Sequence, residues 1–168
     1  DETFGDLEQL IKFVSETKKF DAKHDDKLQK LKRLLNTKDL IGKKVIIFSE
    51  YADTTRYLYR ELLKAGIEVI EKVDSGSGSN RLGIIQRFSP YYNEKVSSDF
   101  EGSSRSEIQV LVSTDVLSEG LNLQDACRLI NYDIHWNPVR LMQRIGRVDR
   151  RLDPEIEKRI IADHPEVS

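Results

Sequence analysis

The sequence predicts an α/β protein built on an open, mostly parallel sheet with helices on both faces. Two observations support this fold class. Short β-branched apolar runs recur along the chain, as in VIIFS at 45–49 and IQVLVST at 108–114, and stretches with helical spacing separate them. The runs are continuously apolar and do not alternate with polar residues, which is typical of parallel strands covered on both faces.

The elements of this fold can be placed in order. IEVIEKV at 67–73 and RLINYD at 128–133 are two further candidate strands. The segment 54–66 is predicted to be helical, because apolar and aromatic residues recur there at helical spacing and Gly66 provides a C-terminal stop. A strand, a helix and a second strand of these lengths form a βαβ unit, whose crossover should be right-handed.

Helical patterns also occur at both ends of the chain. Two leucine-rich stripes precede the first strand, so we expect residues 1–36 to be a helical lead-in and residues 37–168 to be the main domain. Pro138 and Pro154 each open a helical pattern near the C-terminus, in agreement with the preference of proline for the first helical turn.

The nineteen residues at 89–107 follow the pattern of an insertion. Five serines occur after Val96, and the segment offers little apolar surface to compensate for ordering its backbone. We therefore expect a flexible surface insertion here.

The composition excludes several classes of protein. The 38% hydrophobic and 33% charged residues indicate a globular chain, and the formal charge of −2 lacks the basic signature of a nucleic-acid-binding domain. The single cysteine excludes an internal disulfide, and three separated histidines offer no metal-site spacing. No apolar run reaches the ~18 residues of a membrane span, and no signal segment opens the chain. We expect a cytoplasmic protein, nucleoid-associated if bacterial, without a metal site or a membrane contact, and we expect the chain to be part of a longer polypeptide.

The glycine- and serine-rich stretch SGSGSNR at 75–81 allows three interpretations. Gly76 and Gly78 begin a dinucleotide-binding fingerprint, but Arg81 stands where the third glycine belongs, which weakens that interpretation. The stretch could be a flexible loop, or a nest of backbone N–H groups that, with Arg81, holds a phosphate. Composition alone leaves the last two open.

Two other stretches carry polar groups at the expected working edge of the sheet. In VSTDVLSEGLNLQ, at 112–124, hydroxyls and backbone amides follow a strand; they suit an ordinary capped turn or sugar and phosphate contacts. In the helix through QRIGRVDR, at 143–150, arginines form one stripe, and all seven cationic residues from Arg105 to Arg151 are arginines. Arginine is preferred where a carboxylate or phosphate is bound bidentately, although a solvated helix face is the usual explanation of a charge run.

Taken together and in order, four stretches resemble motifs four to six of superfamily 2 helicases: VIIFSEY, DSGSGSNRLGIIQRF, VLVSTDVLSEGLNLQ and QRIGRVDR. They are similar in particular to the second RecA-like domain of Swi/Snf-type DNA translocases, including the one associated with bacterial RNA polymerase. The resemblance runs from about Asp26 to Arg151 and implies a RecA-like fold. In this family a glycine- and serine-rich loop follows the second strand and is itself followed by an arginine and a phenylalanine. The stretch SGSGSNR fits this pattern, with Arg81 and Phe88 at those two positions.

The resemblance implies roles at the nucleotide. Arg147 and Arg150 resemble the arginine fingers that reach the γ-phosphate of ATP held by a partner domain, and Gln143 resembles the nucleotide-sensing residue beside them. Gly120 and Asn122 resemble the nucleotide-facing end of motif five. Many helicases have an aspartate for the ribose where Asn122 stands, whereas the Swi/Snf group has an asparagine.

The resemblance also implies contacts to nucleic acid and one internal pair. Arg144 resembles an arginine that pairs within the domain, here with Asp115. The positions at which the family touches the phosphate backbone of a tracked strand are Ser49, Arg81, Ser113 and Thr114.

The chain lacks the phosphate cradle that ATP hydrolysis requires. No GxxxxGK[ST] loop occurs, and the only Asp-Glu pair, at residues 1–2, follows no strand. ATP and Mg²⁺ are therefore expected on an N-terminal RecA-like domain of the same polypeptide, without which this domain should be inactive. The implied function is the C-terminal motor domain of an ATP-dependent translocase on double-stranded DNA. The alternatives are a non-catalytic RecA-like module that binds nucleic acid or protein and, less well supported, a dinucleotide-dependent oxidoreductase.

Overall fold

The computed structural model describes residues 2–18, 21–100, 106–118, 122–126, 128–149 and 153–163. They fall into two compact units, residues 1–35 and residues 36–168. The first unit contains helices α1 (Glu2–Lys18) and α2 (Asp26–Leu35), with a short 3-10 helix, η1 (Ala22–His24), between them. The leucines of α2 that the sequence placed on one stripe include the buried Leu28, Leu31 and Leu35, whereas Leu7, Leu10, Ile11 and Val14 of α1 are exposed.

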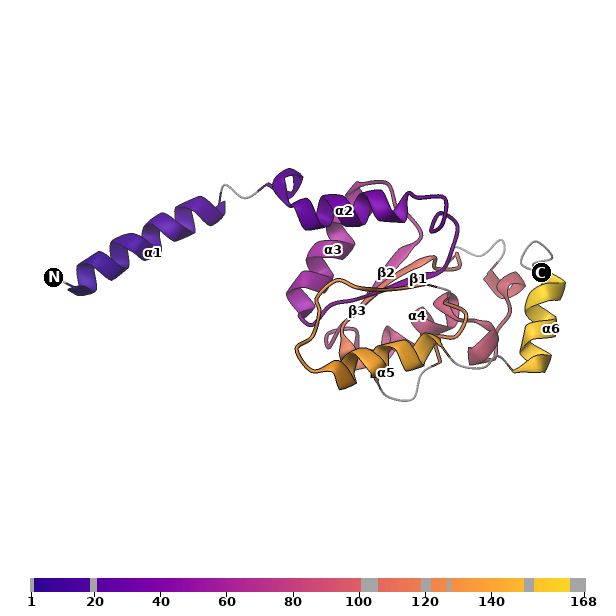
Figure 1. Ribbon diagram of the computed structural model, residues 1–168. Helices are drawn as coiled ribbons and strands as arrows, with labels where there is room; N and C mark the ends of the chain where they lie inside the picture. The colour runs from indigo at the N-terminus through magenta and orange to yellow at the C-terminus, as the bar shows by residue number, and fades with distance from the viewer. Residues whose placement is uncertain are drawn as a thin grey trace. The chain divides into compact units, whose positions relative to one another are not determined.

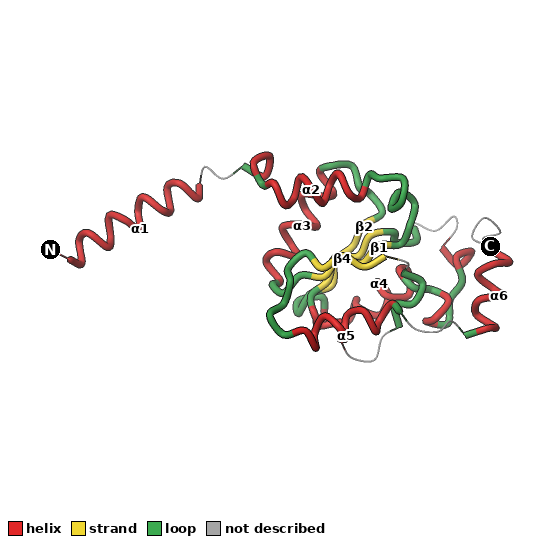
Figure 2. The backbone as a smooth tube through the Cα atoms, in the orientation of Figure 1, coloured by secondary structure: helices red, strands yellow, loops and turns green. Residues whose placement is uncertain are grey.

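The second unit is built on a sheet of four parallel strands, shown in Figures 1 and 2. The strands are β1 (Val45–Phe48), β2 (Ile70–Val73), β3 (Val110–Ser113) and β4 (Arg128–Asn131), in the spatial order β2-β3-β1-β4. All four lie within the predicted strand segments, and the predicted α/β class with a parallel sheet is confirmed. β1 and β3 are buried along their whole length, which explains their continuous apolar runs.

Helices cover both faces of this sheet. Helix α3 (Ala52–Lys64) packs on β2 and β3 from one side, and α4 (Arg81–Phe88) and α5 (Pro138–Val148) lie on the other side (Figure 1). The α4 side holds a core cluster in which Ile84, Ile85 and Phe88 meet strand residues such as Ile46 and Leu111. On the α3 side, Leu58 and Leu62 are fully buried.

Local signals set the ends of two of these helices. Helix α3 ends at Lys64, and Gly66 follows with φ +89°, a left-handed conformation that favours glycine after a helix. Helix α5 begins at Pro138, and the Asn137 side chain accepts a hydrogen bond from the Val139 N–H. Both features agree with the sequence prediction.

The segment after α4 contains two 3-10 helices, η3 (Tyr91–Asn93) and η4 (Ser97–Phe100), and α6 (Pro154–Asp163) completes the described chain. Tyr91 and Ser89 are buried. Their burial was not expected from the composition of 89–107, because Asp125, which accepts hydrogen bonds from both residues, comes from a distant part of the chain. Residues 101–105 lie outside the described residues, and the flexibility of the insertion stays a prediction.

Candidate nucleotide-facing site

Three strands of the sheet end side by side, and the candidate site begins there. Phe48 at the end of β1 is in register with Ser113 of β3 on one side and with Asn131 of β4 on the other. The loops that follow β1, β3 and β4 therefore lie at the same edge of the sheet. In open parallel sheets ligands bind at this edge, where neighbouring connections diverge.

A buried arginine joins these strand ends. Arg144 of α5 makes two hydrogen bonds with Asp115, from Nε to Oδ1 at 2.6 Å and from Nη2 to Oδ2 at 2.9 Å. Its Nη1 donates to Asn131 Oδ1 at 2.9 Å and to the Asp133 carbonyl at 3.3 Å, and its guanidinium lies 5.3 Å from the centre of the Phe48 ring. The predicted Arg144–Asp115 pair is thus present and links all three strand ends to α5.

The electrostatics of this pair favour its charged form. Burial would raise the pKa of the Asp115 carboxyl, but the hydrogen bonds and the charge of Arg144 outweigh that effect and hold the pKa below its ordinary value. Asp115 is therefore a carboxylate at neutral pH and forms an ion pair with Arg144. Arg144 is 3% exposed, so its role is structural.

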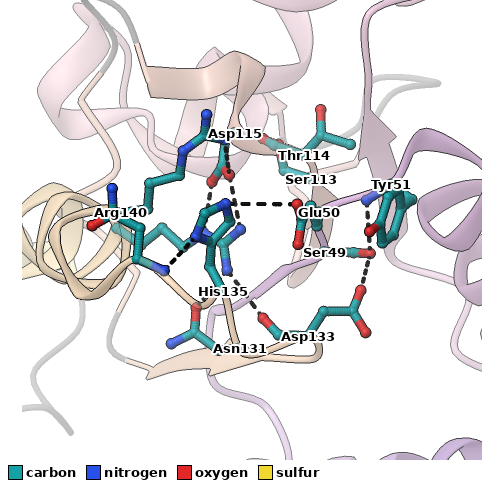
Figure 3. A network of polar contacts seen from close by, with 12 residues as sticks. Ser49, Glu50, Tyr51, Ser113, Thr114, Asp115, Asn131, Asp133, His135 and Arg140 are labelled. Carbon is teal, nitrogen blue, oxygen red and sulfur yellow. Dashed lines mark hydrogen bonds and ion pairs between the residues drawn. The ribbon is translucent and has the colours of Figure 1, made fainter.

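Two further polar contacts fasten the loops of the same edge, as Figure 3 shows. The Ser49 hydroxyl donates to Asp133 Oδ2 at 2.6 Å. The buried His135 accepts a hydrogen bond at Nδ1 from the Asn137 N–H, which places its proton on Nε2, 3.6 Å from a carboxylate oxygen of Glu50. The loop after β1 is thereby tied to the loop that leads into α5.

These residues surround a pocket of about 380 Å³. Its lining includes two of the residues predicted to face a nucleotide, Gln143 and Arg147, together with the fixed pair and three neighbours. The complete lining is Phe48, Asp115, Val116, Arg140, Gln143, Arg144 and Arg147. A half-open pocket lined by three arginines suits a polyanionic ligand such as a phosphate chain.

The structure does not bring together all of the predicted nucleotide residues. Gly120 and Arg150 lie outside the described residues. Asn122 is half-buried, and its backbone carbonyl accepts a hydrogen bond from the Asn93 side chain at 3.0 Å.

Two of the predicted nucleic-acid contacts lie inside the domain in this structure. Ser49 and Ser113 are both 0% exposed. The Ser113 hydroxyl is within hydrogen-bonding distance of the Val73 and Thr114 carbonyls, and the Ser49 hydroxyl is bonded to Asp133. The hydroxyls of both serines are therefore already used in hydrogen bonds within the domain.

Thr114 and Arg81 differ from these serines. The Thr114 hydroxyl and the Arg81 Nε are buried, and neither has a hydrogen-bond partner among the described residues. Buried polar groups without partners are uncommon and call for an explanation. Of the four predicted nucleic-acid positions, these two retain unused hydrogen-bonding capacity.

The glycine- and serine-rich loop is held by an acid. Asp74, at the end of β2, accepts hydrogen bonds from the Gly76 N–H at 2.8 Å and from the side chains of Arg56 and Lys72. Burial would raise the Asp74 pKa, but these partners hold it below its ordinary value. The Gly76 N–H therefore already serves an internal carboxylate and is not available to a phosphate.

The contacts of Glu50, His135, Asp133 and Asn131 were missed by sequence reasoning. Each contact joins residues from separate strand ends, and no local pattern marks it. The described part of the chain contains no grouping of histidine, cysteine and acidic residues that could hold a metal ion, and none of its helices has the length and apolarity of a membrane span.

Comparisons with known proteins identify the family of this domain. Residues 26–151 match the helicase conserved C-terminal domain. The chain belongs to this family. It is 37% identical over 121 residues to the uncharacterized ATP-dependent helicase YqhH of Bacillus subtilis, covering 70% of the chain and 19% of YqhH. It is 32% identical over 109 residues to the RNA polymerase-associated protein RapA of Yersinia pestis, covering 65% of the chain and 10% of RapA.

A solved structure supports the same assignment. The Hef helicase domain of Pyrococcus furiosus superimposes with a TM-score of 0.53 at 26% identity, covering 90% of this chain and 28% of that one. The predicted RecA-like, superfamily 2 helicase C-terminal domain is therefore confirmed. The chain spans only 19% of YqhH and 10% of RapA.

Proposed function

We propose that this chain is the second motor domain of an ATP-driven nucleic-acid translocase. The observation that carries the proposal is the pocket in which Gln143 and Arg147 lie beside the fixed Arg144–Asp115 pair. Arg144 is engaged by Asp115, Asn131 and Asp133, so this proposal assigns the phosphate contacts to arginines that follow it in the sequence. Arg147 and Arg150 act as arginine fingers in this proposal.

ATP and Mg²⁺ would be held mainly by an N-terminal RecA-like domain of the same polypeptide. The present chain has no GxxxxGK[ST] loop. Among the described residues that line the pocket, the one acid is Asp115, which is hydrogen-bonded to Arg144. This described lining suits the negative γ-phosphate better than a cation. ATP supplies the phosphoryl group that is transferred to water, and the arginines stabilise the charge that develops on it, an effect of ~10³–10⁵ in rate.

Nucleic acid would be bound at the same sheet edge. The unpartnered Thr114 hydroxyl and Arg81 Nε are the side-chain groups proposed for phosphate contacts. Such contacts position a strand without reading its sequence, as translocation requires. The Swi/Snf resemblance favours double-stranded DNA as the track. The cytoplasm is the proposed location.

The test is an ATPase assay on the complete polypeptide with Arg147→Ala. Turnover should fall by about 10³-fold or more, because the lost guanidinium stabilises the transferring phosphoryl group. ATP binding, measured with a fluorescent analogue, should change little. Arg60→Ala serves as the matched control, because Arg60 lies on the exposed side of α3, where it contacts Glu61 and the Tyr57 ring of the same helix.

Three outcomes would contradict the proposal. Unchanged turnover of Arg147→Ala would exclude the arginine-finger role. Robust hydrolysis by the isolated chain would show that it holds a complete ATP site of its own. A chain that binds DNA while the complete polypeptide hydrolyses no ATP would favour the non-catalytic binding module.

A further inference from the structure

Helix α5, which carries Gln143 and Arg147 at the pocket, is not held to the domain by an apolar face. Within this helix, all of which is described, Arg144 is the one buried side chain, and Val139 and Met142 are 57% and 70% exposed. A surface helix normally packs on its domain through an apolar stripe. The position of α5 therefore depends largely on polar contacts.

Contacts along α5 hold its middle, its end and its first turn. Arg144 holds the middle, and Val148 packs against the core cluster at the end. At the first turn, the Asn137 side chain accepts a hydrogen bond from the Val139 N–H, and the Asn137 N–H donates to Nδ1 of His135 at 2.9 Å. The residue that caps α5 is therefore itself attached to His135.

The ring of His135 is fixed on its other side as well. His135 is only 6% exposed, and its ring stacks on that of Trp136 with the centroids 5.6 Å apart. The hydrogen bond accepted at Nδ1 places the ring proton on Nε2, which lies 3.6 Å from Oε1 of Glu50 (Figure 3). The ring therefore lies between the loop that follows β1 and the first turn of α5.

The backbone before His135 is held by the same two elements. The Tyr132 N–H donates to the Phe48 carbonyl of β1 at 2.8 Å, and the Ser49 hydroxyl donates to Asp133 Oδ2 at 2.6 Å. The Asp133 carbonyl in turn accepts from Nη1 of Arg144 at 3.3 Å. A side chain can position another group only when its own surroundings hold it in place, and these contacts meet that condition.

We propose that His135 is a positioning residue for ATP hydrolysis, whose Nδ1 fixes the first turn of α5 and thereby the direction in which Gln143 and Arg147 point. The inference rests on the proposed arginine-finger function and deepens it, because it gives a role to a histidine that the sequence did not connect with the nucleotide. Without this attachment α5 can rock about Arg144.

A small rocking motion is enough to affect catalysis. The tip of a side chain lies ~5–6 Å from the axis of its helix, so a rotation of ~10° displaces it by about 1 Å. Displacements of that size cost up to ~10²-fold in rate, because the reacting groups must meet in a narrow range of geometries. The attachment at His135 therefore matters to Arg147 although the two side chains belong to different parts of the site.

The experiment compares two substitutions of His135 in the complete polypeptide. His135→Leu removes the contacts of both ring nitrogens. His135→Asn loses the group that faces Glu50 but keeps an acceptor for the Asn137 N–H, because an asparagine side chain readily accepts the backbone N–H two residues on. The control is His24→Leu, the same change at an exposed histidine of η1.

His135→Leu should lower kcat for ATP hydrolysis by about tenfold, which lies between the few-fold effect of one lost hydrogen bond and the ~10²-fold cost of a 1 Å displacement. KM for ATP should change less than about twofold, because the N-terminal domain holds most of the nucleotide. His135→Asn should restore kcat to within about threefold of the unmodified protein. Hydrogen exchange of the amides at 139–142 should accelerate in His135→Leu and not in His135→Asn or His24→Leu.

The possible outcomes separate this inference from the proposed function. An unchanged kcat for His135→Leu overturns it, as does an equal loss in His135→Asn or a loss that only follows unfolding in a thermal melt. If Arg147→Ala abolishes hydrolysis while His135→Leu keeps full activity, the arginine-finger role stands and the positioning role alone fails. If Arg147→Ala leaves turnover unchanged, the proposed function fails and takes the catalytic role of His135 with it, whatever the exchange data show.

Discussion

Replacing Arg144 with methionine should destabilise the domain far more than the same change at Arg140. Arg144→Met keeps the apolar length of the side chain but removes all of the guanidinium hydrogen bonds to Asp115, Asn131 and Asp133. Breaking a buried ion pair by removing one partner costs ~3–5 kcal/mol. Asp115 keeps 24% of its side-chain surface in solvent and can regain some hydration, so we expect about 3 kcal/mol, at the lower end of that range.

Thermal unfolding followed by circular dichroism measures this difference. At about 4 °C for each kcal/mol in a domain of this size, Arg144→Met should lower Tm by about 12 °C. Arg140 is half exposed and contacts Asp115 at 3.5 Å, an interaction worth ~0–1 kcal/mol, so Arg140→Met should lower Tm by only a few degrees. Equal shifts for the two variants would refute the view that Arg144 holds the strand ends together.

The remaining predictions concern acid stability and one turn. The depressed pKa of Asp115 means that its contribution to stability is present above the ordinary aspartate pKa of ~3.9 and is lost as the pH falls through the folded-state value. The difference in unfolding free energy between the unmodified chain and Asp115→Asn, from urea titrations, should therefore be largest near pH 7 and shrink below about pH 4; a constant difference would contradict the charge argument. At Gly66 an added methyl group would meet open space, but φ is +89°, so Gly66→Ala should lower the unfolding free energy by ~1–2 kcal/mol. Gly146 lies in α5 with open space around it, so Gly146→Ala should raise the unfolding free energy by ~0.5–1 kcal/mol. Destabilisation of the same size at both glycines would show that conformation does not explain the Gly66 effect.

The fold was predictable from the sequence in its elements but not in its strand order. Continuous apolar runs identified the strands, and Gly66 and Pro138 marked helix boundaries where the structure has them. The runs of β1 and β3 look alike because both strands are buried on both faces. Nothing local indicates that β1 lies between β3 and β4, because that position depends on tertiary contacts.

The candidate site was predictable only where the family resemblance reached it. The Arg144–Asp115 pair came from that resemblance, since the two residues are far apart in the sequence and neither marks the other. The burial of Ser49 and Ser113 could not be foreseen, because polar residues at a strand end face solvent or the core depending on the neighbouring loops. In contrast, Asp74 had a local signal: an aspartate that precedes Ser-Gly is typical of a turn in which the side chain accepts the backbone N–H two residues on.

The position of β1 in the middle of the sheet also affects how the chain folds during synthesis. Its partners β3 and β4 lie 65 and 83 residues further along the chain. At ~5–20 residues per second, a ribosome needs roughly 4–17 s to make the interval between β1 and β4. Throughout that time an apolar strand has at least one unpaired edge, which favours aggregation. Fragments that end before β4 should therefore be poorly soluble, and the last quarter of the chain protects β1 from pairing with strands of other molecules.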